Sequence, residues 1–303
     1  MRACAGLSGS VLQLPAPPRI RHAPPGEPFV MPEGPEIRRA ADQLAKAVVG
    51  EVAQRVTLSQ PWLTDRGDEL SGRQVLSIKP RGKALLTRFE GDLVLYTHNQ
   101  LYGKWFTCAP GKPPRTGRTL RVSIETTKRW ALLYSASEIE LLHERDLATH
   151  PFLRKLGPDL LDDEATPALL RRRLMDKRFR GRALGGLLLD QSFVAGIGNY
   201  LRSEILFFAG LLPGLRPKDL STDELAGLAR AMRSVVLRSY RTGGVTELAE
   251  HVRRAKAAGE PRRLWRHAVF ARGGSLCRRC RTKIEKTYVA GRQFYCCADC
   301  QPV

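Results

Sequence analysis

The chain has 303 residues, of which 43% are hydrophobic, and its formal net charge is +20. This length suffices for two domains and a small appendage, and the apolar content is ordinary for a globular protein with a proper core. No run of about eighteen apolar residues occurs, so no membrane-spanning helix is predicted. The charge favours a polyanionic partner, of which nucleic acid is the commonest. Half of this charge, a net +10, lies in residues 251–303, which hold thirteen Lys and Arg against three Asp and Glu.

Residues 1–30 are rich in Pro, Ala, Gly and Arg, contain a single acidic residue, Glu27, and show no apolar periodicity. We expect this segment to be disordered. Three interpretations remain open: a start assigned upstream of the true one at Met31, a leader that is removed, or an extension that is retained. The apolar stretch at residues 11–14 is too short for a secretory signal.

The hexapeptide Met31-Pro32-Glu33-Gly34-Pro35-Glu36 is typical of the beginning of a protein. If Met31 were the initiator and were removed, Pro32 would carry a free secondary amine, a nucleophile near neutral pH because α-amino groups titrate near pH ~8. Beside the Glu33 carboxylate, such an amine suits Schiff-base chemistry on a sugar aldehyde. With residues 1–30 attached, the same nitrogen is an amide and this chemistry is impossible. The simpler alternative is a helix N-terminus that begins with these prolines and acids.

Helical spacing of apolar residues predicts a helix over residues 36–49, followed by strands from about residue 51 to residue 135. The strands flank turns at residues 80–82 and 91–92, and alternating apolar residues mark another strand at residues 120–124. This region therefore reads as a mostly antiparallel sheet domain with one helix at its front.

Residues 150–158 contain prolines and a glycine and are typical of a linker. Beyond them, the pattern predicts helices over residues 167–177, 184–193, 200–209 and 221–239, the last of which opens on a capping box. Residues 242–259 are basic and weakly periodic, and we expect a loop there. The turn Gly196-Ile197-Gly198-Asn199 opens one helix and could hold a phosphate at its N-terminus, although a plain turn between helices is the simpler interpretation.

Two features of the sheet domain allow a functional interpretation. Lys83 follows a turn at the start of a strand. It could discourage edge-to-edge pairing, or it could be a cation for a phosphate or a proton carrier in a cleft. Gln100, Leu101 and Tyr102 lie between two strands. Leu101 and Tyr102 could belong to the core, or the loop could fill the gap that an extruded base leaves in a duplex.

The cysteines predict a metal site near the C-terminus. Their pattern is C-x2-C-x16-C-x2-C, typical of four thiolates around one structural zinc ion with no open position; it comprises Cys277, Cys280, Cys297 and Cys300. Cys296 could also pair with Cys300, but the two-residue spacing favours Cys297. Residues 287–295 alternate as a hairpin would, with residues 290–292 at the tip. Arg292 is either a solvated charge or a contact to a phosphate or a groove.

The chain closely resembles the formamidopyrimidine-DNA glycosylase/endonuclease VIII family in five motifs that occur in the same order. These motifs are Pro32-Glu33-Gly34-Pro35-Glu36, Arg81-Gly82-Lys83, Gln100-Leu101-Tyr102, Gly198-Asn199 and the four-cysteine finger. The resemblance runs from Met31 to Gln301 and includes residues 133–137 and 150–153. The Gly-Pro-Glu opening and the Gln-Leu-Tyr loop place the chain nearer to the endonuclease VIII branch, which is directed at oxidised pyrimidines, than to the oxidised-purine branch.

The resemblance implies an α+β multidomain fold. Residues 1–30 would be a disordered extension or a misassigned start. They would be followed by an antiparallel β-sandwich with a leading helix (31–150), a helix–two-turns–helix domain (151–262) and a β-hairpin zinc finger (263–303). The implied protein is a monomeric base-excision-repair enzyme of the bacterial cytoplasm, at the nucleoid. It would be a DNA glycosylase and abasic-site lyase that removes oxidised pyrimidines from double-stranded DNA through a Schiff base at an N-terminal proline, followed by β,δ-elimination. It would hold one structural Zn²⁺.

The resemblance also assigns roles to single residues. Pro32 would be the nucleophile and Glu33 the proton donor, and Glu36 would support that site. Lys83 would donate a proton in β-elimination, and Arg292 would assist δ-elimination. The loop residues Gln100, Leu101 and Tyr102 would fill the space in the DNA helix. The residues that would bind phosphates are Lys155, Asn199 and Arg292.

Three features depart from the family's pattern. Residues 1–30 block the Pro32 nitrogen if they are retained, Lys155 stands where an arginine is expected, and Cys296 replaces an aromatic residue. Either Arg154 or Lys155 could still hold a phosphate, and residues 242–261 are also longer than expected. Two other functions fit parts of the sequence. A non-catalytic zinc-finger DNA-binding protein would result if residues 1–30 were retained. A zinc-ribbon regulator unrelated to repair would explain the cysteines and the charge, but not Glu33, Lys83 or Asn199.

Overall fold

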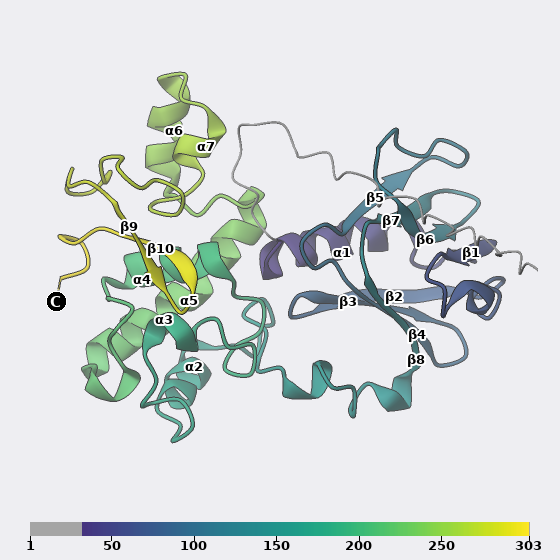
Figure 1. Cartoon of the computed structure of the whole chain (residues 1–303), viewed down its shortest axis with the longest axis horizontal. Coiled ribbons are helices and arrows are strands. Elements are labelled where there is room, and N and C mark those ends of the chain that lie inside the picture. Colours follow the sequence, from purple (N-terminus) through teal and green to yellow (C-terminus); the bar gives the residue numbers. More distant parts are fainter. Residues whose placement is uncertain (1–31, 303) are drawn as a thin grey trace, which may run out of the picture.

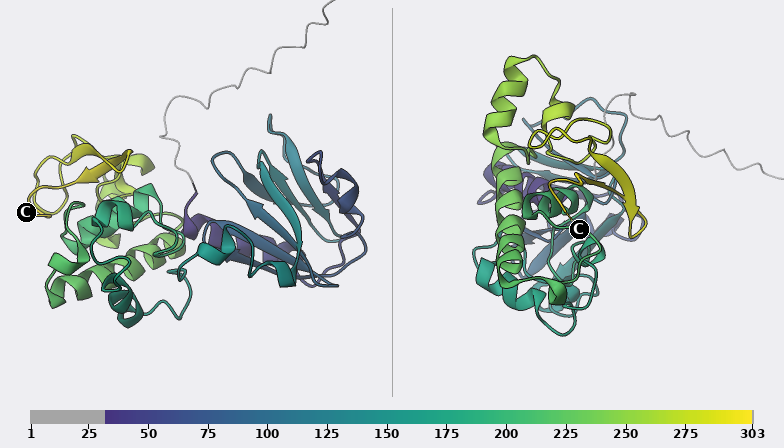
Figure 2. Two further views of the ribbon diagram at one scale, coloured as in Figure 1. Left: turned by 60° about the horizontal axis from the view of Figure 1, so that its bottom comes forward. Right: turned by 90° about the vertical axis from the view of Figure 1, so that its left-hand side faces the viewer.

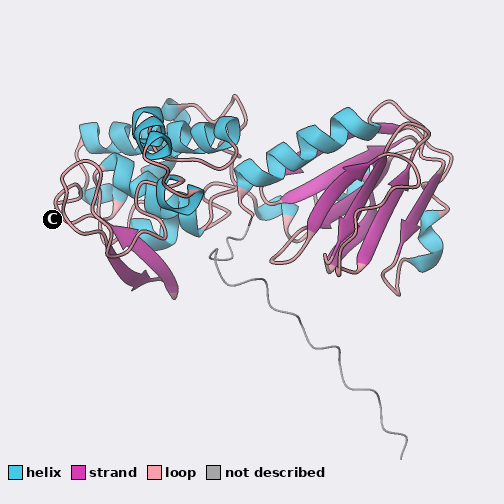
Figure 3. Cartoon of the chain, turned by 90° about the horizontal axis from the view of Figure 1, so that it is seen from above, coloured by secondary structure: helices cyan, strands magenta, loops and turns pink. Residues whose placement is uncertain are grey.

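The computed structural model describes residues 32–302, so the expectations for residues 1–30 lie outside the described part of the chain. A β-sandwich and a mainly helical body lie side by side, and the N-terminal end of helix α1 (Gly34–Val48) reaches the helical body (Figure 1). The view from above shows the same helix along one side of the sandwich (Figure 3). The predicted order of sandwich, helical region and C-terminal hairpin is confirmed.

Helix α1 forms where its apolar residues recur at helical spacing. Ile37, Ala41 and Leu44 are buried, as is Val48 in the last turn. A capping box closes its N-terminus, in which the Glu36 carboxylate accepts a hydrogen bond from the Glu33 N–H at 3.1 Å. The helix begins two residues before the predicted start because Pro35 fits the first turn.

The sandwich consists of two four-stranded antiparallel sheets with strand orders β1-β6-β7-β5 and β2-β3-β4-β8. Their strands are β1 (Arg55–Leu58), β2 (Val75–Arg81), β3 (Ala84–Phe89), β4 (Leu93–His98), β5 (Lys104–Cys108), β6 (Leu120–Glu125), β7 (Trp130–Tyr134) and β8 (Glu138–His143). Apolar residues of both sheets and of α1 share one core. The turn between β2 and β3 was misplaced by the sequence pattern: Pro80 pairs with Leu85 inside the ladder, so the turn is Gly82-Lys83.

The helical body contains α2 (Pro167–Leu174), α3 (Leu184–Leu187), α4 (Asn199–Ala209), α5 (Thr222–Thr242), α6 (Ala249–Ala257) and α7 (Arg262–Trp265). The helix predicted over residues 184–193 is much shorter, because the Asp190 carboxylate accepts a hydrogen bond from the Ser192 N–H and stabilises a turn. The loop predicted over residues 242–259 was also wrong. Helix α6 forms there because Val252 and Ala255 pack with Val245 and Trp265.

The C-terminal hairpin consists of β9 (Glu285–Val289) and β10 (Arg292–Cys296), and it projects from the helical body (Figure 2). Its turn is Ala290-Gly291, where both residues have positive φ (52° and 71°). Arg292 pairs with Val289, so it is the first residue of β10 and not part of the turn. Within residues 32–302, no helix is long and apolar enough to cross a membrane.

Candidate active site

The carboxylate of Glu33 lies at the N-terminus of α4, in the helical body. The N–H groups of Gly198, Tyr200 and Leu201 donate to it at 2.7, 2.9 and 3.3 Å, and the residue is 2% exposed. The first N–H groups of a helix have no partner within the helix, so Glu33 satisfies them from outside. Burial raises the pKa of Glu33 to about 7, although the nearby Lys83 ammonium opposes this shift.

The glycines before α4 allow this approach. The Gly34 N–H donates to the Gly196 carbonyl at 2.8 Å, which brings the two chain segments into direct backbone contact. A Cβ atom on Gly198 would lie 2.4 Å from the carboxyl carbon of Glu33. The anion at this helix N-terminus is therefore a carboxylate of the protein.

A cleft of about 880 Å³ begins beside these residues. Pro32 and Glu36 line it from the start of α1, and Leu101 and Tyr102 line it from the loop between β4 and β5. Leu101 and Tyr102 are 38% and 51% exposed, so they do not belong to the core. Five basic side chains face the same cleft, namely Arg39, Lys46, Lys104, Arg118 and Arg241.

Glu36 is tied to the helical body by two side chains that the sequence did not single out. The Tyr200 hydroxyl donates to its carboxylate at 3.0 Å, and the Arg266 guanidinium forms an ion pair with it at 3.5 Å. Burial raises the pKa of Glu36. The only sequence signal for Tyr200 was its position directly after Gly198-Asn199.

Lys83 interacts electrostatically with Glu33 and with Arg292, which come from two other parts of the chain. Burial lowers the pKa of Lys83, the Glu33 charge opposes this, and the positive charge of Arg292 lowers it further. These mutual effects join the β2–β3 turn, the start of α1 and the zinc-finger hairpin in one electrostatic cluster. The turn is held in place by Asp159, whose carboxylate accepts a hydrogen bond from the Gly82 N–H at 3.2 Å.

The Gln100 loop is held in a defined conformation. Gln100 has a φ of 48°, its side-chain amide donates to the Glu138 carboxylate at 2.8 Å, and it accepts from the Ser137 hydroxyl at 2.5 Å. Lys155 is exposed at the end of the 3₁₀ turn Leu153–Lys155, in the linker between the two bodies. Asn199 is half-buried and donates to the Gln293 carbonyl of β10 at 2.9 Å.

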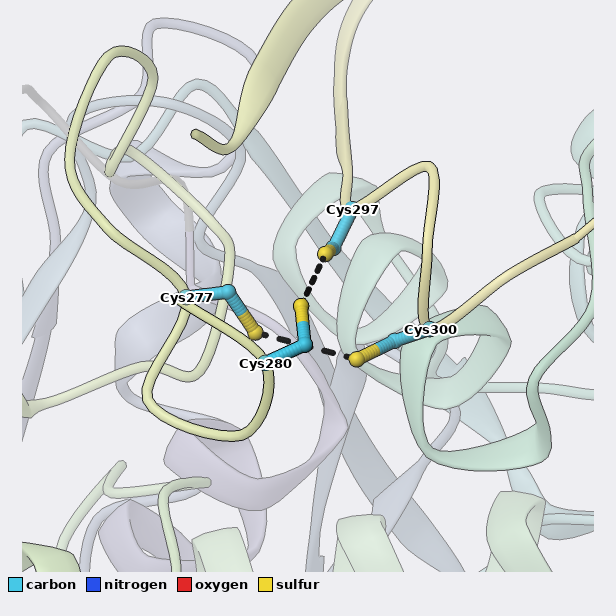
Figure 4. Close-up of side chains that lie close together, drawn as sticks. All are labelled: Cys277, Cys280, Cys297 and Cys300. Atoms are coloured by element: carbon cyan, nitrogen blue, oxygen red, sulfur yellow. Dashed lines mark hydrogen bonds between the residues drawn. The ribbon is translucent and has the colours of Figure 1, made fainter. Parts of the chain in front are cut away.

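The four predicted zinc ligands converge (Figure 4). The sulfurs of Cys277, Cys280, Cys297 and Cys300 all lie within 4.8 Å of one another. Their cross pairs are 3.8 Å (Cys277–Cys300) and 3.3 Å (Cys280–Cys297) apart. Four thiolates at the zinc–sulfur distance of about 2.3 Å would be separated by about 3.8 Å, so this donor set fits one tetrahedral zinc ion. Cys296 is buried beside this cluster but is not one of its members, so the geometry favours Cys297 as the ligand.

Comparisons with known proteins agree with this arrangement. Residues 31–137 match the family model of the formamidopyrimidine-DNA glycosylase N-terminal domain, and residues 156–249 match that of the formamidopyrimidine-DNA glycosylase H2TH domain. Endonuclease 8 from an Escherichia coli O139:H28 strain is 47% identical over 271 residues, which cover 89% of this chain and all of the relative. Endonuclease 8 from Shigella sonnei is 46% identical over the same lengths.

The chain belongs to the formamidopyrimidine-DNA glycosylase/endonuclease VIII family.

Solved structures similar to this member of the family show the same fold. Lactococcus lactis formamidopyrimidine-DNA glycosylase bound to DNA with an abasic site has a TM-score of 0.72 at 22% identity, covering 89% of this chain and 99% of that one. The same enzyme in complex with DNA that contains an oxidised pyrimidine has a TM-score of 0.73 at 22% identity, with the same coverage. At this identity, the likeness concerns the fold alone.

Proposed function

We propose that this member of the family is a bifunctional DNA glycosylase and abasic-site lyase of base excision repair, acting on oxidised pyrimidines in double-stranded DNA. One observation carries the proposal: Pro32 lines a basic cleft, and the next residue, Glu33, interacts electrostatically with Lys83, so a nucleophile and two proton carriers are grouped at the start of α1. The curated relatives named endonuclease 8 support it. We also propose that the enzyme acts in the bacterial cytoplasm, at the nucleoid, and carries one structural zinc ion on its four cysteines.

The chemistry follows from the nitrogen of Pro32 and the side chains of Glu33 and Lys83. A free secondary amine on Pro32 would attack C1′ of the damaged nucleotide and form the C–N bond as the base leaves. The proton of the amine leaves with the base. A protonated Glu33, whose pKa is raised to about 7, can supply at neutral pH the proton that O4′ takes up when the C1′–O4′ bond breaks, which turns the C1′–N bond into an iminium. The resulting iminium acidifies the C2′ protons, so that the 3′ phosphate and then the 5′ phosphate are eliminated. Lys83, with its lowered pKa, exchanges protons in the first elimination, and Arg292 assists the second.

The remaining predicted residues would position the duplex. Leu101 and Tyr102 line the cleft, and with the neighbouring Gln100 they would occupy the space of the extruded nucleotide. Asn199, Lys155 and Arg292 would hold phosphates on the damaged strand. The domain limits at residues 31–150, 151–262 and 263–303 are part of the same proposal.

Borohydride trapping on duplex DNA with thymine glycol tests the proposal, using the full-length chain and a protein that begins at Pro32. We expect a covalent product only when Pro32 is the terminal residue, because an amide nitrogen cannot form an iminium. Trapping by both proteins, with mass analysis that excludes trimming, would move the nucleophile to another amine, with Lys83 as the first candidate. Trapping and strand cleavage by neither protein would favour the non-catalytic alternative.

A further inference from the structure

Arg202, on the second turn of α4, is a buried cation at the junction between this helix and the zinc finger. It is 0% exposed, and no hydrogen bond joins its guanidinium to a carboxylate of the described residues. Its Nη1 donates to the carbonyls of Gly185 and Val289 at 3.1 and 3.0 Å. Its Nη2 donates to the Asn199 Oδ1 and the Gln293 carbonyl at 2.7 and 3.2 Å. Sites of this kind favour arginine, because its planar fork serves several acceptors in fixed directions.

The contact with Asn199 fixes the orientation of the Asn199 amide. An asparagine side chain can exchange its oxygen and nitrogen by a rotation of about 180°, and the hydrogen-bond network decides between the two positions. Arg202 is only a donor, so it holds the Asn199 Oδ1 inward. The Nδ2 group then donates one hydrogen to the Gln293 carbonyl. Its second hydrogen is left for an external acceptor such as a phosphate.

The other contacts fix the position of Arg292. Val289 is the cross-strand partner of Arg292, and Gln293 is the next residue along β10. Arg202 donates to the carbonyls of both, so the backbone on each side of the hairpin turn is attached to α4. The Arg202 guanidinium also lies 5.4 Å from the ring centroid of Phe294, which is fully buried.

We propose that Arg202 is a positioning residue that holds Asn199 and Arg292 in register to bind phosphates of the damaged strand. The inference rests on the proposed function, because it assumes that both residues meet DNA. It goes beyond that function in assigning their alignment to one buried guanidinium. The charge persists at neutral pH, since burial, the nearby Arg292 charge and the opposing Glu33 charge leave the pKa of Arg202 at about 10. This buried charge also adds to the positive potential at the site.

Double-mutant cycles test the inference. Arg202→Met is combined with Asn199→Ala and with Arg292→Ala, in protein that begins at Pro32. The measured quantities are the dissociation constant for duplex DNA with an abasic-site analogue, its salt dependence, and the ratio of δ- to β-elimination products. We expect Arg202→Met to weaken binding about tenfold. The slope of log K against log salt should fall by about one unit, since about 0.9 is lost for each phosphate contact. The δ-elimination share should also fall.

The decisive result is non-additivity: Arg202→Met should add little to a protein that already carries Asn199→Ala and Arg292→Ala. Arg272→Met is the matched control, because Arg272 is also buried and donates to two carbonyls, those of Ala268 and Leu276. The effect of Arg272→Met on stability should be additive with the effects of the two alanine substitutions. The ratio of δ- to β-elimination products should stay unchanged. Zinc content and thermal unfolding confirm that each variant is folded.

Arg202→Lys and Arg202→Gln are measured beside Arg202→Met to keep the test decisive. Lysine preserves the charge but not the fork, so it should restore the salt slope better than the product ratio. Additive cycles in folded variants would overturn the inference while leaving the proposed function intact. Loss of fold or of zinc in all three variants would also overturn it, since Arg202 would then be required for the fold itself. A wild-type protein that neither binds nor cleaves damaged DNA would instead overturn the proposed function.

Discussion

The Glu33 carboxylate accepts a hydrogen bond at 2.9 Å from the N–H of Tyr200, which lies 167 residues further along the chain. The same carboxylate is the proposed proton donor, so the group proposed to perform the chemistry also joins the sandwich to the helical body. Ionisation of Glu33 and the placement of the two bodies are therefore coupled. The first two predictions follow from this coupling.

Glu33→Gln should slow base removal by a factor of about 10² or more, since the variant cannot donate a proton. In the wild-type enzyme, base removal should decline as the pH rises above about 7, because Glu33 loses its proton there. The raised pKa also means that the folded state favours protonated Glu33. The free energy of unfolding should thus fall between pH 4.5 and about 7 as Glu33 ionises, and less so in the variant. Rates on thymine glycol duplex and urea unfolding at each pH measure both effects; a variant with wild-type rates would refute the assignment.

Gly198→Ala should displace the Glu33 side chain, because the added Cβ would lie 2.4 Å from its carboxyl carbon. We expect a loss of about 1–3 kcal/mol in the free energy of unfolding and a severe loss of base removal. Gly227→Ala in the middle of α5 is the control, since nothing lies within 4 Å of its added Cβ. That change should stabilise the protein by about 0.5–1 kcal/mol and leave activity unchanged. Urea unfolding and single-turnover kinetics on both variants provide the comparison, and full activity of Gly198→Ala would show that Glu33 needs no such approach.

Local patterns predicted the elements whose signals lie within a few residues. The apolar spacing of α1, the Ser221 capping box of α5 and the cysteine pairs are of this kind. Helix α6 was missed because the two apolar residues that it packs inward, Val252 and Ala255, find their partners only after the chain folds back to Trp265.

The supporting residues of the site could not be predicted for a similar reason. Tyr200 and Arg266 act on Glu36 across 164 and 230 residues of chain, and no local spacing records such contacts. The role of the glycines was also hidden. The motif suggested an anion at the helix N-terminus, but only the fold shows that this anion is Glu33.

Cys280→Ser should abolish the zinc site and with it the DNA affinity that the finger supplies. The finger is too small to hold its hairpin by a core alone, and metal binding supplies its folding free energy. Cys296→Ala is the control, because Cys296 lies in the hydrophobic core and not in the sulfur cluster. Metal analysis should find one zinc per chain in the wild type and in the control, and close to none in Cys280→Ser. Loss of zinc from Cys296→Ala with retention in Cys297→Ala would show the other ligand set.

Leu101→Ala should impair the repair of lesions in duplex DNA without destabilising the protein. The Leu101 side chain is 38% exposed at the cleft, so its truncation should change the free energy of unfolding by less than about 0.5 kcal/mol. Without it, the gap left by the extruded nucleotide stays empty, and we expect about tenfold slower base removal from duplex. Cleavage of a single-stranded abasic oligonucleotide should be unaffected, because no stacked helix has to be filled. Leu76→Ala is the control, since Leu76 is an exposed leucine of β2 that does not line the cleft. Equal losses on single- and double-stranded substrates would contradict a role in filling the helix.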